Sequence, residues 1–144
     1  PVSVMAEAAN FAGRPSEEAA AIALKFENGA IAALTVGGYG ANAHLDFPRI
    51  DITTANGQAR LKGRHHMWES LSWATRGADA VQTLTRPPEV LGTTRYTHAL
   101  THFVACVRSG ETPSVTIEDG ITAVALAEAV YQSARTGQKV YLKE

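Results

Sequence analysis

The chain has 144 residues, of which 45% are apolar and 19% are charged, values typical of one globular domain with a buried core. Its net charge of -1, from 13 Lys and Arg against 14 Asp and Glu, offers no basic cluster for nucleic acid, and no apolar run approaches the roughly 20 residues of a membrane span. The single cysteine, Cys106, excludes an internal disulfide framework and fits a reducing compartment, so we expect a cytoplasmic protein without nucleic-acid or membrane partners.

Residues 2–85 contain a series of extended runs in which apolar and other side chains alternate with the period of two expected of half-buried strands. These runs cover residues 2–8, 17–26, 30–36, 49–55, 58–62, 66–74 and 79–85. Asn28-Gly29 and Asn56-Gly57 each separate two of the runs, and Asn-Gly is typical of tight hairpin turns because both residues tolerate positive φ. We therefore expect an antiparallel meander of about six strands.

After the last of these runs the period changes to 3.6, which predicts two helices. The first helix ends at Gly110, where a left-handed C′ residue is usual. Its apolar stripe is formed by Tyr96, Ala99, Leu100, Phe103 and Val107. The second helix opens at Thr116, whose spacing from Asp119 is close to that of a capping box, and it closes at Gly137. Residues 139–142 then return as a strand.

This order of elements predicts an α+β fold: an open, predominantly antiparallel β-sheet of about six strands with helices on one face, in a single domain of residues 1–144. The second face of such a sheet must be covered or wetted. Alanines at alternate positions, such as Ala19, Ala21 and Ala23, give one face a flat apolar surface. That face either packs against a second copy of the chain or lies under a loop.

Three stretches of the chain carry a recognisable pattern. They are FENGAIAALTVGG at residues 26–38, IDITTANGQARL at residues 50–61, and the helix-loop-helix-strand segment of residues 96–142. The last stretch is the most specific, because a helix ending in Phe-Val-x-x-Val-Arg-x-Gly is followed in order by Pro113, Glu118-Asp119-Gly120 and an Ala-rich helix. Together the three stretches resemble the C-terminal domain of the glucose-fructose oxidoreductase and inositol dehydrogenase family, also called Gfo/Idh/MocA.

The resemblance implies a two-domain oxidoreductase that depends on NAD or NADP and acts on a sugar, a polyol or a related hydroxyl compound. In that family an N-terminal Rossmann domain binds the nicotinamide cofactor, and the C-terminal domain walls the substrate side and supplies a sheet for oligomerisation. The family's catalytic Lys, Asp and His would all lie before Pro1, so no catalytic or cofactor-binding residue is assigned to this chain. We therefore expect an upstream Rossmann domain, an inactive isolated chain, and a homodimer or tetramer formed through the sheet.

Four residues are candidates for contact with the substrate: His44, Arg49, His66 and Trp68. His44 and Arg49 bracket the far end of a glycine-rich segment. His66 and Trp68 share one face of an extended run, where an imidazole and an indole could hydrogen-bond to a sugar and stack on it. Packing in a core or an interface is the alternative role for these two aromatic side chains.

Other patterns that resemble functional sites have a simpler structural explanation. Residues 38–43 (GYGANA) match G-x-G-x-x-A, but a strand follows them where a dinucleotide fold requires a helix. His98 and His102 lie four residues apart on a helix, yet they lack a third ligand, so we expect no metal site. Cys106 is expected to be a small core residue.

A second class of function stays open at this point, namely a stand-alone, non-catalytic α+β module that dimerises through its sheet and binds a small ligand or a protein. A Gly-rich strand-turn-helix and a Glu-Lys-Pro motif encoded upstream of Pro1 would favour the oxidoreductase. A start codon immediately before Pro1 would favour the module.

Overall fold

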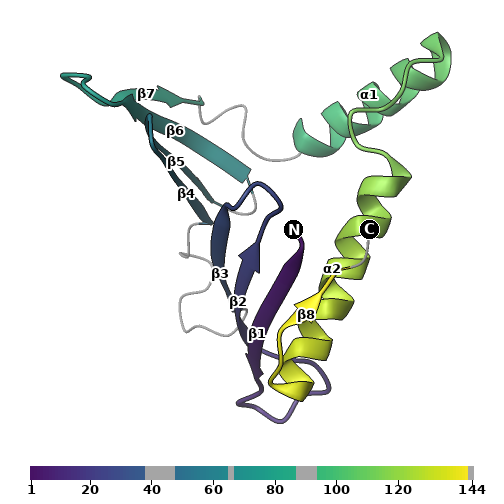
Figure 1. Ribbon diagram of the computed structural model, residues 1–144. Coiled ribbons are helices and arrows are strands. Elements are labelled where there is room, and N and C mark those ends of the chain that lie inside the picture. The colour runs from purple at the N-terminus through teal and green to yellow at the C-terminus, as the bar shows by residue number, and fades with distance from the viewer. Residues whose placement is uncertain (38–47, 65–66, 87–93, 143–144) are drawn as a thin grey trace. The chain divides into compact units, whose positions relative to one another are not determined.

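A computed structural model describes residues 1–37, 48–64, 67–86 and 94–142 of the chain. These residues form eight strands and two helices, which group into two compact units (Figure 1). The first unit joins Pro1–Ala41 to Ser114–Glu144, and the second unit is Asn42–Pro113. The predicted α+β class with open antiparallel strand pairing is confirmed, and the described strands form two sheets of four where one sheet of about six strands was expected.

The sheet of the first unit has the strand order β3-β2-β1-β8, and every neighbouring pair is antiparallel. Its strands are β1 (Ser3–Ala9), β2 (Ala19–Lys25), β3 (Ile31–Gly37) and β8 (Val140–Tyr141). The predicted hairpin between β2 and β3 is confirmed, and the Phe26 N–H closes it by donating to the Ala30 carbonyl oxygen at an N to O distance of 2.8 Å. Gly29 adopts a φ of 87°, a left-handed value that glycine reaches without a steric penalty.

The helix of the first unit, α2 (Ile117–Thr136), is capped as the sequence predicts. The Thr116 hydroxyl oxygen accepts from the Asp119 backbone N–H, and the Asp119 carboxylate accepts from the Thr116 backbone N–H at 2.8 Å, which completes a capping box. Gly137 ends the helix with a φ of 65°, and its N–H donates to the Ser133 carbonyl oxygen. These caps satisfy backbone groups that a helix leaves unpaired at its ends.

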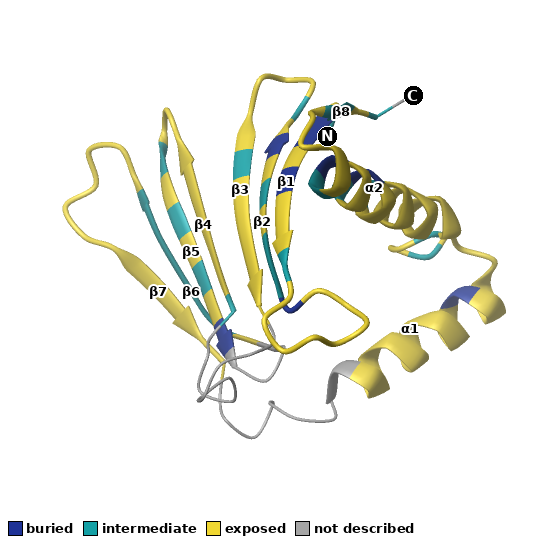
Figure 2. Ribbon diagram, turned by 90° about the horizontal axis from the view of Figure 1, so that it is seen from below, coloured by how far each residue is buried: buried dark blue, intermediate teal, exposed yellow. Residues whose placement is uncertain are grey.

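The core of the first unit lies between α2 and one face of its sheet, and Figure 2 shows the buried residues gathered there. Val4 and Leu24 pair across β1 and β2 and pack with Ala129 of α2. Seven partly buried apolar side chains surround them: Ile22, Phe26, Ala32, Leu126, Val130, Val140 and Leu142. The apolar alternation of β1 and β2 therefore points toward the helix, as expected for a sheet covered on one face.

The sheet of the second unit has the strand order β4-β5-β6-β7 and is also antiparallel throughout. Its strands are β4 (Arg49–Thr54), β5 (Gly57–Arg64), β6 (Met67–Thr75) and β7 (Gln82–Thr85). The predicted first helix is confirmed as α1 (Thr94–Ser109). Neither α1 nor α2, the helices of the described segments, is long and apolar enough to cross a membrane.

The hairpin predicted at Asn56-Gly57 is confirmed, although its turn lies one residue earlier. Thr54 pairs with Gly57, so Ala55 and Asn56 are the two central residues of the turn. Gly57 is needed for a different reason, because a β-carbon at this position would overlap the carbonyl oxygen of Ala74 on β6. The Asn-Gly pair therefore predicted the right hairpin, although Gly57 is required by the close approach of β5 to β6 and not by the turn itself.

A β-bulge interrupts the pairing of β5 with β6. Lys62 pairs with Ser70 and Gly63 pairs with Trp68, which leaves Glu69 as the extra residue on β6. The bulge breaks the alternation of faces along β6, so a face assigned from sequence on one side of it does not carry over to the other side.

A buried hydroxyl joins α2 to the sheet of the first unit. Ser133 is 0% exposed, and its Oγ accepts from the Ala6 backbone N–H at 3.0 Å while it donates to the Gln138 carbonyl oxygen at 2.7 Å. β8 pairs only with Ser3 and Val4, so it supplies no ladder partner for Ala6. The Ser133 hydroxyl thus satisfies a buried backbone donor at the point where the sheet ends.

Replacing Ser133 by alanine is expected to lower the free energy of unfolding by about 1–3 kcal/mol, since it leaves the Ala6 N–H and the Gln138 carbonyl without this partner. Urea denaturation followed by circular dichroism measures the change. Thr122→Ala is the matched control, because the Thr122 hydroxyl donates to the Glu118 carbonyl oxygen on the exposed side of the same helix. Equal losses in the two variants would contradict the assigned role of Ser133.

Candidate functional site

Two of the four residues predicted to contact substrate fall in the described part of the chain. Arg49 is the first residue of β4, with a side chain 59% exposed. Trp68 lies on β6 beside the bulge and is 39% exposed. His44 and His66 lie outside the described residues, as does the glycine-rich segment 38–43. Of the predicted residues, Arg49 is therefore the one whose charged neighbours define a candidate site.

The sheet of the second unit has one polar face and one apolar face, because directly paired residues project on the same side of a sheet. The polar face carries Arg49, Asp51, Thr53, Gln58, Arg60, Lys62, Ser70, Ser72, Thr83 and Thr85. The apolar face carries Ile50, Ile52, Ala59, Leu61, Leu71, Trp73 and Leu84. Ile50 and Ile52 therefore share one face, as do Leu71 and Trp73.

A hollow of about 400 Å³ is formed mainly by residues of the polar face, a volume within the range of small-molecule sites. Its polar lining includes Asp51, Gln58, Arg60, Lys62, Ser70 and Ser72. Trp73 and Val81 also line it and add apolar surface. The hollow therefore combines charged groups, hydroxyl groups and an indole within a single unit of the chain.

The charged residues that line the hollow are Asp51, Arg60 and Lys62, and Arg49 joins them through its contact with Asp51. Arg49 Nε lies 2.9 Å from Asp51 Oδ2, and Arg60 Nε donates to Asp51 Oδ1. Both contacts use Nε, so the described residues provide no further partner for the Nη groups of either arginine. Lys62 lies directly across from Arg49 in the β4–β5 ladder. We name Arg49, Asp51, Arg60 and Lys62 the cation cluster, which has three positive charges and one negative charge.

The cation cluster keeps its carboxylate ionised. The hydrogen bond from Arg60 is the largest cause that lowers the pKa of Asp51 from its ordinary value of 3.8, and the charges of Arg49, Arg60 and Lys62 act in the same direction. Partial desolvation raises the pKa of Asp51, but by less than the other causes together lower it. At neutral pH Asp51 is therefore an acceptor occupied by two guanidinium groups, and it is poorly placed to act as a general base.

Sequence reasoning identified Arg49 but missed the other three members of the cation cluster. A signal for them was present, because Arg49 and Asp51 are two apart on one predicted strand and Arg60 and Lys62 are two apart on the next. In a hairpin of known register such residues must meet on one face. The turn position, which the sequence placed one residue too late, decides that register.

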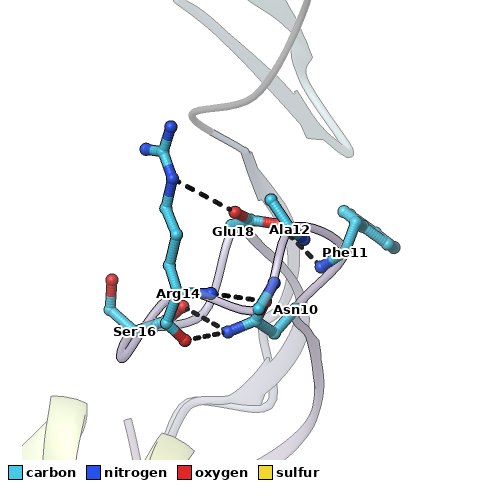
Figure 3. A network of polar contacts seen from close by, with 7 residues as sticks. Asn10, Phe11, Ala12, Arg14, Ser16 and Glu18 are labelled. Carbon is cyan, nitrogen blue, oxygen red and sulfur yellow. Dashed lines mark hydrogen bonds and ion pairs between the residues drawn. The ribbon is translucent and has the colours of Figure 1, made fainter.

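A second polar network, in the first unit, surrounds the nearly buried carboxylate of Glu18 (Figure 3). Glu18 Oε2 accepts from the backbone N–H groups of Phe11 and Ala12 at 2.6 and 2.9 Å, and Arg14 Nε lies 3.6 Å from Oε1. Asn10 Oδ1 accepts from the backbone N–H groups of Gly13 and Arg14 in the same loop.

These bonds are all internal to the connection between β1 and β2. Asn10 Nδ2 completes them by donating to the carbonyl oxygens of Arg14 and Ser16. A buried carboxylate is costly unless it is hydrogen-bonded, and here it satisfies two backbone donors of a turn. The network therefore shapes the loop between β1 and β2.

The cysteine of α1 lies beside one of the two histidines of that helix. Cys106 is buried, as predicted, and its Sγ lies 3.7 Å from His102 Nε2. In the segments that the structure describes, no three side chains of His, Cys, Asp or Glu are grouped so that they could hold a metal ion.

Comparison with known proteins relates nearly the whole chain to one family. The model of an oxidoreductase family's C-terminal alpha/beta domain, that of Gfo/Idh/MocA, matches residues 1–142. D-apiose dehydrogenase of Paraburkholderia graminis is 28% identical over 133 residues, which cover 88% of this chain and 35% of that protein. The chain thus spans about a third of the length of this relative.

Solved structures share the fold at lower identity. An oxidoreductase domain protein from Kribbella flavida matches with a TM-score of 0.85 at 17% identity, covering 99% of this chain and 44% of that one. Aldose-aldose oxidoreductase from Caulobacter crescentus matches with a TM-score of 0.77 at 21% identity, covering 99% and 41%. The WlbA dehydrogenase from Bordetella pertussis, solved with NADH and UDP-GlcNAcA, matches with a TM-score of 0.73 at 24% identity, covering 99% and 39%.

Removing the Arg60 guanidinium is expected to raise the pKa of Asp51 toward 3.8, since it removes the largest cause of the lowered value. The carboxyl carbon of Asp51, followed by NMR through an acid titration, reports this in Arg60→Gln. Because the folded pKa lies below the unfolded value, the stabilising contribution of the ionised Asp51 is present at neutral pH and is lost as the pH falls through the folded pKa.

Arg86→Gln is the matched control for this titration, because Arg86 lies just beyond β7 and is not part of the lining of the hollow. It removes the same charge from the same unit, and it should leave the Asp51 midpoint unchanged. A wild-type midpoint at or above 3.8 would refute the arrangement of the cation cluster.

Proposed function

The chain belongs to the Gfo/Idh/MocA oxidoreductase family as its C-terminal alpha/beta domain, and from this membership we propose that it is the substrate-side and oligomerisation domain of an NAD(P)-dependent oxidoreductase. The proposed substrate is a sugar, a polyol or a related hydroxyl compound. The observation that carries this proposal is the family match, which covers residues 1–142.

The length of the relatives supports a second domain in the full-length protein. The chain covers 35% of D-apiose dehydrogenase and 39–45% of the similar solved chains. Two of those solved proteins, WlbA and levoglucosan dehydrogenase, are complexes with NADH. We assign the remaining part to an N-terminal Rossmann domain that binds NAD or NADP, and residues 1–142 to one C-terminal domain. The catalytic and cofactor-binding residues then belong to the Rossmann side, and a cofactor performs the hydride transfer while the protein positions the substrate.

The surfaces of this chain suit a domain that docks on others. On α2, Ile117, Ile121 and Val124 are 75%, 64% and 62% exposed and line an apolar hollow of about 480 Å³. Exposed apolar patches of this kind are typical of contact with another protein surface. We assign this stretch of α2 to the contact with the Rossmann domain.

The substrate contacts from this chain are proposed to include Arg49, together with His44, His66 and Trp68. Arg49 contacts Asp51, and Asp51 lines the hollow of the second unit, where hydroxyl groups also gather. D-apiose dehydrogenase and levoglucosan dehydrogenase are both named for sugar substrates, which supports a polyhydroxylated substrate for this chain. The proposal also includes a cytoplasmic location, which the lone buried Cys106 supports.

The full-length protein is expected to bind NADH or NADPH in calorimetry and to oxidise sugars or polyols from a substrate panel. The isolated 144-residue chain should show neither activity nor nicotinamide affinity, because the phosphate-binding loop would lie in the other domain. A full-length protein that binds neither nicotinamide cofactor would refute the proposed function.

The isolated chain is also expected to elute from gel filtration as a dimer or a larger species. Figure 2 shows α2 on one face of the β1–β3 sheet. Ile31 follows on the other face, because its neighbour Ala32 packs toward the core, and it is 82% exposed. Ile31→Lys places a charge on that side and should shift the chain toward the monomer. Light scattering measures the mass independently of the shape of the protein. A wild-type chain that is monomeric at tens of micromolar would contradict the proposed oligomer.

A further inference from the structure

The cation cluster contains an arrangement that opposes folding. Arg49 and Lys62 are direct cross-strand partners, and like charges placed opposite each other in a sheet are destabilising. The next pair, Asp51 with Arg60, is favourable, but its carboxylate is already shared by Arg49 and Arg60. Positions where a chain breaks a local rule of stability without compensation are typical of functional sites.

The cluster has the groups that an anion requires. The described residues use only Nε of Arg49 and of Arg60, so four Nη groups stay available for a planar or tetrahedral anion. Lys62 is exposed and lines the hollow with Arg60. Asp51 does not cancel this charge, because three positive groups surround one negative group and the remainder is about two positive charges.

The rest of the hollow has the groups that hydroxyls require. Ser70 and Ser72 line it, and the Ser72 hydroxyl lies 3.0 Å from the Thr83 hydroxyl across β6 and β7. A volume of about 400 Å³ accommodates a molecule of monosaccharide size.

From this combination we propose that the hollow of the second unit binds a small polyhydroxylated molecule that carries one anionic group, with the anion on the cation cluster and the hydroxyl groups toward Ser70 and Ser72. A sugar acid and a sugar phosphate share this chemistry. The inference deepens the proposed function, since on that function the bound molecule is the substrate or its product.

The test is a titration of the 144-residue chain with sodium D-gluconate, D-glucose 6-phosphate and D-glucitol at constant ionic strength. D-Glucitol has the same carbon chain as gluconate, with an uncharged hydroxymethyl group in place of the carboxylate. The chain has two tryptophans, Trp68 and Trp73, both on β6, and their fluorescence in the unmodified chain follows binding, with calorimetry as the independent measurement. Either anion is expected to bind at least about tenfold more tightly than D-glucitol, and the tighter anion identifies the acid or the phosphate as the source.

Lys62→Gln separates binding from folding. It is expected to weaken anion binding by about tenfold, and yet to unfold at the same or a higher temperature, because it removes the repulsion from Arg49. A purely structural lysine would not change these two quantities in opposite directions. Arg86→Gln removes a charge outside the hollow and should bind like the parent chain.

Three outcomes would overturn the inference. They are equal affinity for D-glucitol and both anions, no fluorescence or calorimetric response to any of the three compounds up to about 50 mM, and unchanged anion binding in Lys62→Gln. None of them involves a nicotinamide cofactor. If the chain does not bind the anions, NADH binding by the full-length protein is unaffected. If the full-length protein does not bind NADH, the anion site on this chain is unaffected.

Discussion

In the β4–β5 hairpin, the position of a two-residue turn decides which side chains meet across the strands. Thr54 pairs with Gly57, and each later pair follows from it until Asp51 meets Arg60 and Arg49 meets Lys62. A slip of one residue would carry the whole charged set to the apolar side of the sheet. The hollow, its positive charge and the separation of the two faces all depend on this register, which the close approach of Gly57 to the backbone of β6 reinforces.

The first unit is organised around the small residues of α2. Ala129 and Ser133 lie one helical turn apart and are both buried, so the helix backbone can come close to β1. This closeness lets the Ser133 hydroxyl reach the Ala6 N–H and replace the ladder partner that the short β8 does not provide. A larger residue at either position would push the helix away from Val4 and Leu24, because a packed interior tolerates little added volume.

Membership in the oxidoreductase family and the charge of the second unit support one consistent proposal. In a two-domain dehydrogenase the cofactor performs the hydride transfer, and the other domain contributes the shape and the charge that select a substrate. Arg49 and Lys62 form a repulsive cross-strand pair, so a binding role gives a physical reason for the arrangement. The hydroxyl groups and the anion of the proposed ligand would meet groups of matching chemistry on the polar face of the β4-β5-β6-β7 sheet.

The sequence alone determined the identity and order of the elements, because alternation, Asn-Gly pairs, the Thr116 capping box and Gly137 are local signals that depend only on neighbouring residues. It also indicated Arg49 as a functional candidate, but it did not predict that Asp51, Arg60 and Lys62 lie beside it. Only the tertiary structure decided the turn position, the bulge after Lys62, and the contacts of Ser133. Each of these depends on where a second strand or helix passes, and such contacts between distant residues leave no periodic trace in the chain.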